Sequence, residues 1–439
     1  MTSQTLRTLV FIAAGLLLFC LAGAGIGGFL LVRANNAAGG GSYPLQVETP
    51  NKVGGLGDVK AIVAGADHSL ALDADGAVWA WGANQYGQLG VATGKDCGGN
   101  TLNAVACSHI PRRVPGLGPV RTVAAGANHS LALGTDGSVW TWGWNQSGQL
   151  GDGTSTDRLA PARVPGLANI TALAGGGGQS LALDANGAVW QWGSDLAGTQ
   201  TCQPPGWSTG FPCNLAPTKV VGLPTVTAIA AASGYNLALA SDGAVWSWGY
   251  NELGQLGNGT TTDQPTPARI ANLTGITTIA AGRSHAVALA ANGDAWGWGD
   301  NAYGTIGTAS RDSCQNPAAP GLTNPCSLTP VKFYGQSDLA AVAAGDSRTL
   351  LLRRNGTVLR LGFIEPDRHG FGSAADACEL TPPTTQLANC KAQPTLVADL
   401  ADVAAIAVGG QHFLALAPDR TGKGTARAWG YNYHGQSAR

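Results

Sequence analysis

Short apolar runs recur along most of this chain, and clusters of Gly, Asp, Asn and Pro separate them. In the first copy the runs cover residues 59–64, 69–72, 77–81 and 111–114. In the third run Trp79 and Trp81 alternate with Val78 and Ala80, so both faces of a strand here would be apolar. A sheet built from such strands must be covered on both sides, as a propeller blade is by its two neighbours.

Tight turns join these runs. Asp-Gly or Asn-Gly lies between the second and third runs, at 73–76, 135–137, 185–187 and 241–243. These dipeptides tolerate the positive φ angles of a hairpin turn. Each unit is therefore predicted to be a four-stranded antiparallel sheet.

The unit occurs seven times, and each copy ends its third run with a Trp-Gly or a degenerate form of it. The closing glycines are Gly82, Gly143, Gly193, Gly249, Gly299, Gly362 and Gly430. Their spacings of 61, 50, 56, 50, 63 and 68 residues define a repeat that cannot bury both of its faces alone. Eleven of the thirteen Trp residues occupy two positions of the third run, which indicates a structural role for them.

The two ends of the repeat region predict ring closure. The last repeat stops at residues 429–436 without a fourth run, whereas a spare fourth run, 49–56, precedes the first repeat. An N-terminal strand that completes the last blade would remove an exposed sheet edge. We therefore expect an all-β, seven-bladed propeller over residues 46–439.

The N-terminal residues 1–33 are predicted to be a membrane anchor or signal helix. Residues 9–32 carry no charge and lie between Arg7 and Arg33. As a helix this run would be about 36 Å long, enough to cross a ~30 Å hydrocarbon core. A cleaved signal peptide ending near residues 22–24 is the alternative, but the apolar run continues past that site and favours an uncleaved anchor. Residues 34–45, with three consecutive glycines, are expected to form a flexible linker.

The cysteines indicate the compartment. Apart from Cys20 there are four local pairs, each between the third and fourth strands of a blade: Cys97 with Cys107, Cys202 with Cys213, Cys314 with Cys326, and Cys378 with Cys390. Disulfides would close these insertions and would persist only in an oxidising compartment, so the propeller is expected outside the cytoplasm: periplasmic, at the cell surface, or secreted if the signal is cleaved. Zinc binding is less favoured, because the pairs are widely spaced and no neighbouring histidine supports it.

Histidine recurs at one position of the repeat. His68, His129, His285 and His412 are equivalent, and Gln179, Tyr235 and Arg348 replace them in the other blades. We expect these histidines to satisfy nearby backbone groups at a strand start rather than to bind a metal. His109, His369 and His434 have no companions in the sequence.

No constellation predicts catalysis or a cofactor. The chain lacks a Gly-x-Ser-x-Gly elbow and a phosphate-binding loop, and its acidic residues lie mostly in turns. With 12% charged residues and a net charge of −1 it has no basic cluster for nucleic acid. The sequence therefore favours a non-enzymatic protein. Antiparallel strands would place all four stapled insertions on one face, which favours a protein-binding scaffold.

Residues 64–72 and 139–151 closely resemble the regulator of chromosome condensation repeat, and the similarity extends over residues 49–436. The resemblance implies a seven-bladed propeller. Functions in that family include nucleotide exchange on a small GTPase, ultraviolet photoreception and, for a secreted bacterial protein, inhibition of β-lactamases. The photoreceptor motif has Arg before His, where this chain has Asp67 and Asn128, so that role is not implied.

We expect a bacterial, membrane-tethered, extracytoplasmic protein binder that inserts through residues 9–32 and takes an unidentified protein partner. An exchange factor and a secreted inhibitor or carbohydrate binder are the alternatives.

Overall fold

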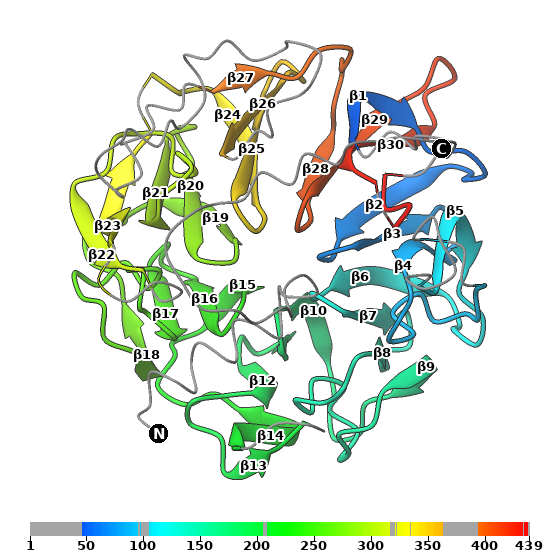
Figure 1. The fold of residues 1–439 in the computed structure, drawn as a ribbon, viewed down its shortest axis with the longest axis horizontal. Helices are drawn as coiled ribbons and strands as arrows, with labels where there is room; N and C mark the ends of the chain where they lie inside the picture. The colour runs from blue at the N-terminus through cyan, green and yellow to red at the C-terminus, as the bar shows by residue number, and fades with distance from the viewer. Residues whose placement is uncertain are drawn as a thin grey trace, which may run out of the picture.

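Seven antiparallel sheets stand around a central channel in the computed structural model (Figure 1). The structure describes residues 46–94, 97, 105–204, 209–316, 321, 323–333, 335–362, 394–432 and 434–437. The predicted anchor, residues 1–33, and the predicted linker, residues 34–45, lie outside these residues. Within the described part of the chain we find no helix with the length and hydropathy that a membrane crossing requires.

The first three blades follow one another along the chain, and each runs from an inner to an outer strand. Blade 1 contains β2 (Val59–Ala64), β3 (His68–Asp73), β4 (Val78–Ala83) and β5 (Cys107–Arg113). Blade 2 contains β6 (Val120–Ala125), β7 (His129–Gly134), β8 (Val139–Gly143) and β9 (Arg158–Arg163). Blade 3 contains β10 (Ile170–Gly175), β11 (Gln179–Asp184), β12 (Val189–Ser194), β14 (Phe211–Lys219) and, at its edge, β13 (Gln200–Cys202).

The next three blades repeat this order. Blade 4 contains β15 (Val226–Ala231), β16 (Tyr235–Ala240), β17 (Val245–Gly249) and β18 (Gln264–Arg269). Blade 5 contains β19 (Ile276–Ala281), β20 (His285–Ala290), β21 (Ala295–Asp300), β23 (Thr323–Lys332) and, at its edge, β22 (Asp312–Gln315). Blade 6 contains β24 (Leu339–Ala344), β25 (Arg348–Arg353), β26 (Val358–Gly362) and β27 (Thr395–Leu396).

Blade 7 joins the two ends of the chain, as predicted. It contains β28 (Ala405–Val408), β29 (His412–Pro418), β30 (Gly424–Tyr431) and β1 (Gln46–Lys52). In Figure 1 the blue strand β1 lies beside the red strands of this blade. The backbone N–H of Val53 donates to the carbonyl of Ala426 at 2.9 Å, so the pairing continues one residue beyond the strand. The N-terminal strand thus closes the ring.

Both faces of each blade are buried, as the alternation predicted. Trp79 and Trp81 pack toward blade 7 in a cluster with Leu414, whereas Val78 and Ala80 pack toward blade 2. The side chain of Trp81 is fully buried. The seven blades therefore share continuous apolar seams instead of seven separate cores.

Two details of the strands differ from the prediction. The fourth strand of blade 1 begins at Cys107 rather than at residue 111, because its first residues pair with Gly82 and Ala83 across a β-bulge. The insertions of blades 3 and 5 also contain short edge strands, β13 and β22, which the sequence pattern did not predict. Their alternation is too short to be distinguished from a loop.

Candidate functional site: the loop face and the channel mouth

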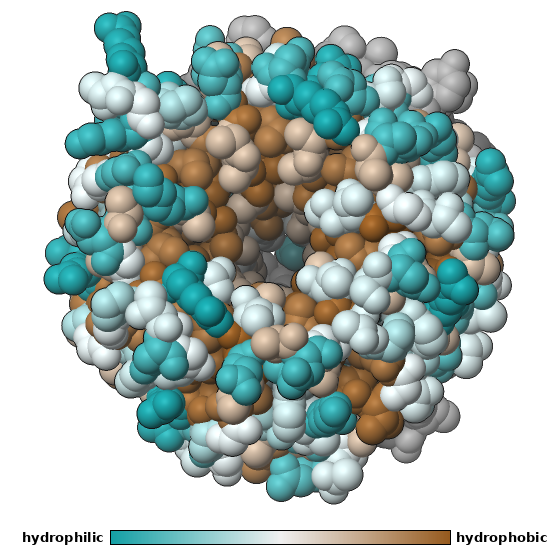
Figure 2. Space-filling view, turned by 180° about the vertical axis from the view of Figure 1, so that it is seen from behind, coloured by the Kyte–Doolittle hydropathy of each residue, from teal (hydrophilic) through white to brown (hydrophobic). Residues whose placement is uncertain are grey.

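Seven short loops, each after the first strand of a blade, meet around one mouth of the channel. A cavity of about 140 Å³ lies between them and is lined by residues such as Gly65, Gly126, Gly176, Arg283 and Asp346. Because the strands of a blade alternate in direction, the loops after the third strands, which carry the cysteines, emerge on this same side. We call this side the loop face. Figure 2 shows the molecule from behind, relative to Figure 1: it is hollowed at its centre, with hydrophobic side chains around the hollow.

Backbone hydrogen bonds join neighbouring loops around the mouth. The contacts run from Ala66 N to Ala127 O (3.1 Å), Ala127 N to Gly176 O (2.9 Å), Gly177 N to Ala232 O (2.9 Å), Arg283 N to Gly345 O (3.0 Å) and Gly410 N to Ala66 O (3.0 Å). Small residues are required here. A Cβ atom on Gly126 would lie 2.5 Å from the Gly176 carbonyl oxygen, closer than two such atoms approach. The mouth is thus a fixed frame for the groups that line it.

Disulfides close three of the insertions on the loop face. The pairs are Cys97–Cys107, Cys202–Cys213 and Cys314–Cys326, with Cα–Cα distances of 6.0, 5.8 and 5.9 Å. All six cysteines are buried. The fourth expected pair, Cys378 with Cys390, lies outside the described residues.

The recurring histidines lie between blades, and each bonds to a hydroxyl group of the next blade. The Nε2–Oγ contacts are His68 with Ser130 (3.0 Å), His129 with Ser180 (2.9 Å), His285 with Thr349 (2.9 Å) and His412 with Ser69 (2.8 Å). The sequence predicts nearby backbone groups as the partners. His68 and His412 do interact with backbone groups, at Ala127 and Ala66, but the hydroxyl partners were not predicted. The hydroxyl partner lies a full blade away along the chain, so the local pattern does not show it.

The bonds of these hydroxyls show that Nε2 of each ring carries a hydrogen, and the lowered pKa values favour the neutral ring. The Ser130 hydroxyl donates to the Gln88 carbonyl at 2.8 Å, and the Ser180 hydroxyl donates to the Gln149 carbonyl at 2.8 Å. Each hydroxyl must therefore accept a hydrogen bond from its histidine, which places a hydrogen on Nε2. Burial lowers the pKa of His68 to about 4, and burial together with the charge of His68 lowers the pKa of His129 to about 3.

The substituted blades maintain the same link with other groups. Tyr235 donates to the backbone carbonyls of Gly282 and His285 in the next blade, at 3.0 and 2.5 Å. Arg348 donates to the Gly410 carbonyl at 3.1 Å, and its guanidinium lies 5.7 Å from the ring centre of Phe413. This position thus has the structural role that the repeat predicts.

Charged side chains at the mouth form a set that the repeat pattern did not predict. Desolvation and the neighbouring carboxylate of Asp346 raise the pKa of Asp67 to about 6. Burial also raises the pKa of Asp346, although Arg283 and Arg348 oppose the shift, and it raises the pKa of Asp300 to about 6. Of these three carboxyls Asp346 lines the cavity, and a perturbed carboxyl beside a cavity is typical of binding sites.

One signal in the sequence could have identified Arg283 and Asp346. Where blades 5 and 6 have Arg283 and Asp346, the other blades have only small residues: Ala66, Ala127, Gly177, Ser233 and Gly410. A pair of opposite charges thus interrupts an otherwise small-residue ring. This arrangement can contact a partner of mixed charge at the centre of the loop face.

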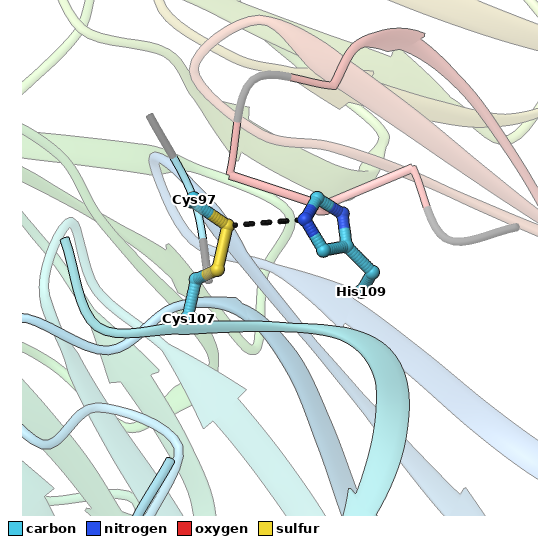
Figure 3. A group of neighbouring side chains, drawn as sticks. All are labelled: Cys97, Cys107 and His109. Atoms are coloured by element: carbon cyan, nitrogen blue, oxygen red, sulfur yellow. Dashed lines mark hydrogen bonds between the residues drawn. A yellow bond between two sulfur atoms is a disulfide. The ribbon is translucent and has the colours of Figure 1, made fainter. Parts of the chain in front are cut away.

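A second cluster lies on the loop face at the junction of blades 1 and 7. His109 Nε2 lies 3.3 Å from Cys97 Sγ (Figure 3). The sulfur atoms of Cys97 and Cys107 and a ring nitrogen of His109 all lie within 4.8 Å of one another. The expectation that no histidine neighbours a cysteine pair was therefore wrong for blade 1. The expectation that His109 has no companions was also wrong, because it lies near His434. Burial, and after it the charge of His109, lowers the pKa of His434.

This geometry defines a class of protein: a closed β-propeller with a rigid frame and a loop face that carries the variable groups. The family model described as the RCC1-like domain matches residues 24–278, more than half of the chain, and the regulator of chromosome condensation (RCC1) repeat matches residues 276–305. The chain belongs to the RCC1-like domain family.

Proteins similar to this chain include a photoreceptor and an RCC2 homolog. The ultraviolet-B receptor UVR8 of Arabidopsis thaliana is 30% identical over 220 residues, which are 48% of this chain and 45% of the receptor. The RCC2 homolog of Danio rerio is 32% identical over 253 residues, 50% of this chain and 48% of that protein. The chain thus spans less than half of these relatives. The crystal structure of Prp20p from Saccharomyces cerevisiae has a TM-score of 0.62 at 24% identity, with 85% of this chain and 82% of that chain covered, which shows a common fold.

Proposed function

We propose that this chain is a non-enzymatic, protein-binding propeller that holds its partner on the loop face, outside the cytoplasm, with residues 9–32 as its membrane anchor. The observation that carries this proposal is the placement of every disulfide-closed insertion of the described residues on one side of the ring. Loops on a rigid scaffold are where binding residues concentrate.

The composition of the loop face supports a protein partner. Arg283 and Asp346 add opposite charges at its centre, and the rings of Tyr86 and Trp144, 6.2 Å apart, join blades 1 and 2. Arg, Tyr and Trp are enriched where interfaces gain most of their binding energy. Prp20p, which has the same fold, binds Gsp1p and histones, so a propeller of this kind can serve as a protein-binding surface.

The disulfides support an oxidising compartment. A closed loop of about 11 residues constrains the unfolded chain by somewhat under ~3 kcal/mol, a gain that a reducing compartment would remove. The uncharged run of 24 residues at the N-terminus supplies a means of tethering such a domain to a membrane.

Replacing the insertions of blades 1 and 3 with the shorter loop of blade 2 tests whether the loop face binds the partner. Blade 2 connects its third and fourth strands by residues 144–157 without cysteines, so this segment replaces 83–107 in blade 1 and 194–213 in blade 3. Proximity labelling from the intact anchored chain first identifies partners. We expect the double graft to lose partner capture, whereas deletion of residues 419–423 in the β29–β30 hairpin, on the opposite face, retains it.

Three results would contradict the proposal. The first is undiminished capture by a correctly folded double graft. The second is labelling of cytosolic neighbours alone, together with eight reactive thiols on the native propeller. The third is accelerated nucleotide release from a small GTPase, which would instead support an exchange factor.

A further inference from the structure

We propose that Cys97, Cys107 and His109 form a binding site for a thiophilic d10 cation, with Zn²⁺ as its probe, when the Cys97–Cys107 pair is in the dithiol state. In the structure this pair is a disulfide, so the same side chains would serve as a cross-link or as a metal site according to redox state. The inference does not depend on a protein partner, but it requires a dithiol reductant that reaches the propeller.

Comparison of the blades singles out His109. The register of each third strand makes Cys107, Cys213 and Cys326 equivalent, and two residues later blades 3 and 5 have Leu215 and Leu328. Those leucines pack on their disulfides. Blade 1 has an imidazole in place of the leucine.

The neighbouring blade shows that His109 occupies the same space as the leucines. A Cβ atom on Gly148 would lie 2.7 Å from Leu215 Cδ2, and one on Gly254 would lie 2.8 Å from Leu328 Cδ2. A Cβ atom on Gly435 would lie 2.6 Å from His109 Nδ1. Leucine satisfies the packing requirement twice, so packing alone does not account for the histidine.

The distances suit a tetrahedral cation. Zn–S and Zn–N bonds of about 2.3 and 2.0–2.1 Å place sulfur and nitrogen ligands about 3.5 Å apart, and two sulfurs about 3.8 Å apart. His109 Nε2 is already 3.3 Å from Cys97 Sγ. The Cα atoms of Cys97 and Cys107 are 6.0 Å apart, so side-chain rotation of the two cysteines separates the sulfurs without a shift of the strand. Two sulfurs and one imidazole form a ligand set that zinc accepts, with solvent as the fourth ligand.

The redox step balances with a dithiol as the reductant. The dithiol transfers two electrons and two protons to the S–S bond, which breaks to give two cysteine thiols, and the dithiol becomes a disulfide. Zn²⁺ then displaces the two thiol protons to solvent. His109 binds through the Nε2 lone pair and keeps its proton on Nδ1.

Cobalt binding tests the site on the full chain. We reduce the protein with a phosphine, which does not compete as a thiol ligand. We then titrate with Co²⁺ as a spectroscopic substitute for Zn²⁺, because its visible and near-ultraviolet bands report tetrahedral thiolate coordination, and displace it with Zn²⁺. We expect one tight site per chain after reduction and none in the oxidised protein. His109→Leu installs the residue of blades 3 and 5 and should weaken binding by more than the ~10–100-fold that outer-shell groups contribute. The double variant C97S/C107S should abolish the bands.

Alkylation gives a second readout that does not require variants. Zn²⁺ should protect Cys97 and Cys107 from alkylation in the reduced chain, while the cysteines of blades 3 and 5 in the same molecule remain reactive and serve as controls. Equal Co²⁺ affinity in His109→Leu, retained bands in C97S/C107S, or equal protection of all three pairs would overturn the proposal.

Discussion

Replacement of His129 by Gln should flatten the dependence of stability on pH. Gln is a suitable substitute because Gln179 occupies the same position in blade 3, where its side-chain amide donates to the Tyr235 carbonyl of the next blade at 3.4 Å. An amide at position 129 can donate to the Ser180 hydroxyl but does not titrate. We therefore expect the variant to fold and, at about pH 7.5, to lie within about 1 kcal/mol of the native chain.

The magnitude follows from linkage between proton binding and folding. His129 has a pKa lowered from 6.5 to about 3 by burial and by His68, so below pH 6.5 the unfolded chain binds a proton that the folded chain does not. The neutral, buried ring therefore costs no stability above pH 6.5. As the pH falls from 6.5 toward 3, the free energy of unfolding decreases by about 1.4 kcal/mol per pH unit. At pH 5 the loss from one such histidine is about 2 kcal/mol.

Buried carboxyls act in the opposite direction. The pKa of Asp67 and that of Asp300 are raised to about 6, so the folded chain takes up protons as the pH falls through 6, and this uptake stabilises it. The total pH dependence of the native chain is therefore smaller than the histidines alone would give. The difference between the native chain and His129→Gln isolates one histidine because the carboxyls are common to both.

Urea unfolding followed by Trp fluorescence, at several values between about pH 7.5 and 5, measures this difference. As the pH falls, the free energy of unfolding should decrease less steeply in His129→Gln. The two slopes should differ by about 1.4 kcal/mol per pH unit, which corresponds to one proton. Ser180→Ala is the control: it removes the hydroxyl beside the ring and should destabilise the protein by ~1–3 kcal/mol while the slope with pH persists. Equal slopes for the native chain and His129→Gln would refute a buried, neutral His129.

Three further predictions concern the frame. Gly143→Ala should destabilise the protein by several kcal/mol or prevent folding, because φ is +104° and the new Cβ would lie 2.6 Å from the Asn128 carbonyl oxygen. Gly116→Ala is the control, because φ is +78° but the new Cβ would meet open space. It should lower the free energy of unfolding, measured by chemical denaturation, by only about 1–2 kcal/mol. Removal of residues 1–52 deletes β1 and should expose β30, which hydrogen exchange of its amides and light scattering would report as lost protection and self-association. The double variant C202A/C213A should lower the free energy of unfolding by about 2–3 kcal/mol under oxidising conditions and leave it unchanged in reductant; a loss that persists in reductant would show that packing, not the cross-link, is responsible.

The repeat pattern sufficed to predict the ring, since apolar alternation, Asp-Gly turns and the spare strand before the first repeat each depend on local residues. The pairing of β1 with β30 follows from counting strands. The partner of His129 did not follow, because Ser180 lies about one blade further along and only the curvature of the ring brings them together. His109 lies only two residues after Cys107, so its place beside the Cys97–Cys107 pair was open to prediction; it was missed because β5 begins four residues earlier than its apolar pattern indicates.

Departures from the repeat are of two kinds, and they have different physical consequences. Tyr235 and Arg348 replace histidine but still bond to the next blade, so they preserve the frame by other chemistry. Arg283, Asp346 and His109 replace small or apolar residues and add groups that the frame does not require. Burial raises the pKa of Asp346, so the folded chain holds its ionised form less favourably than water does, and this carboxyl does not serve stability in the way that the apolar seams do. The proposed binding role on the loop face accounts for a group of this kind at the centre of the loops.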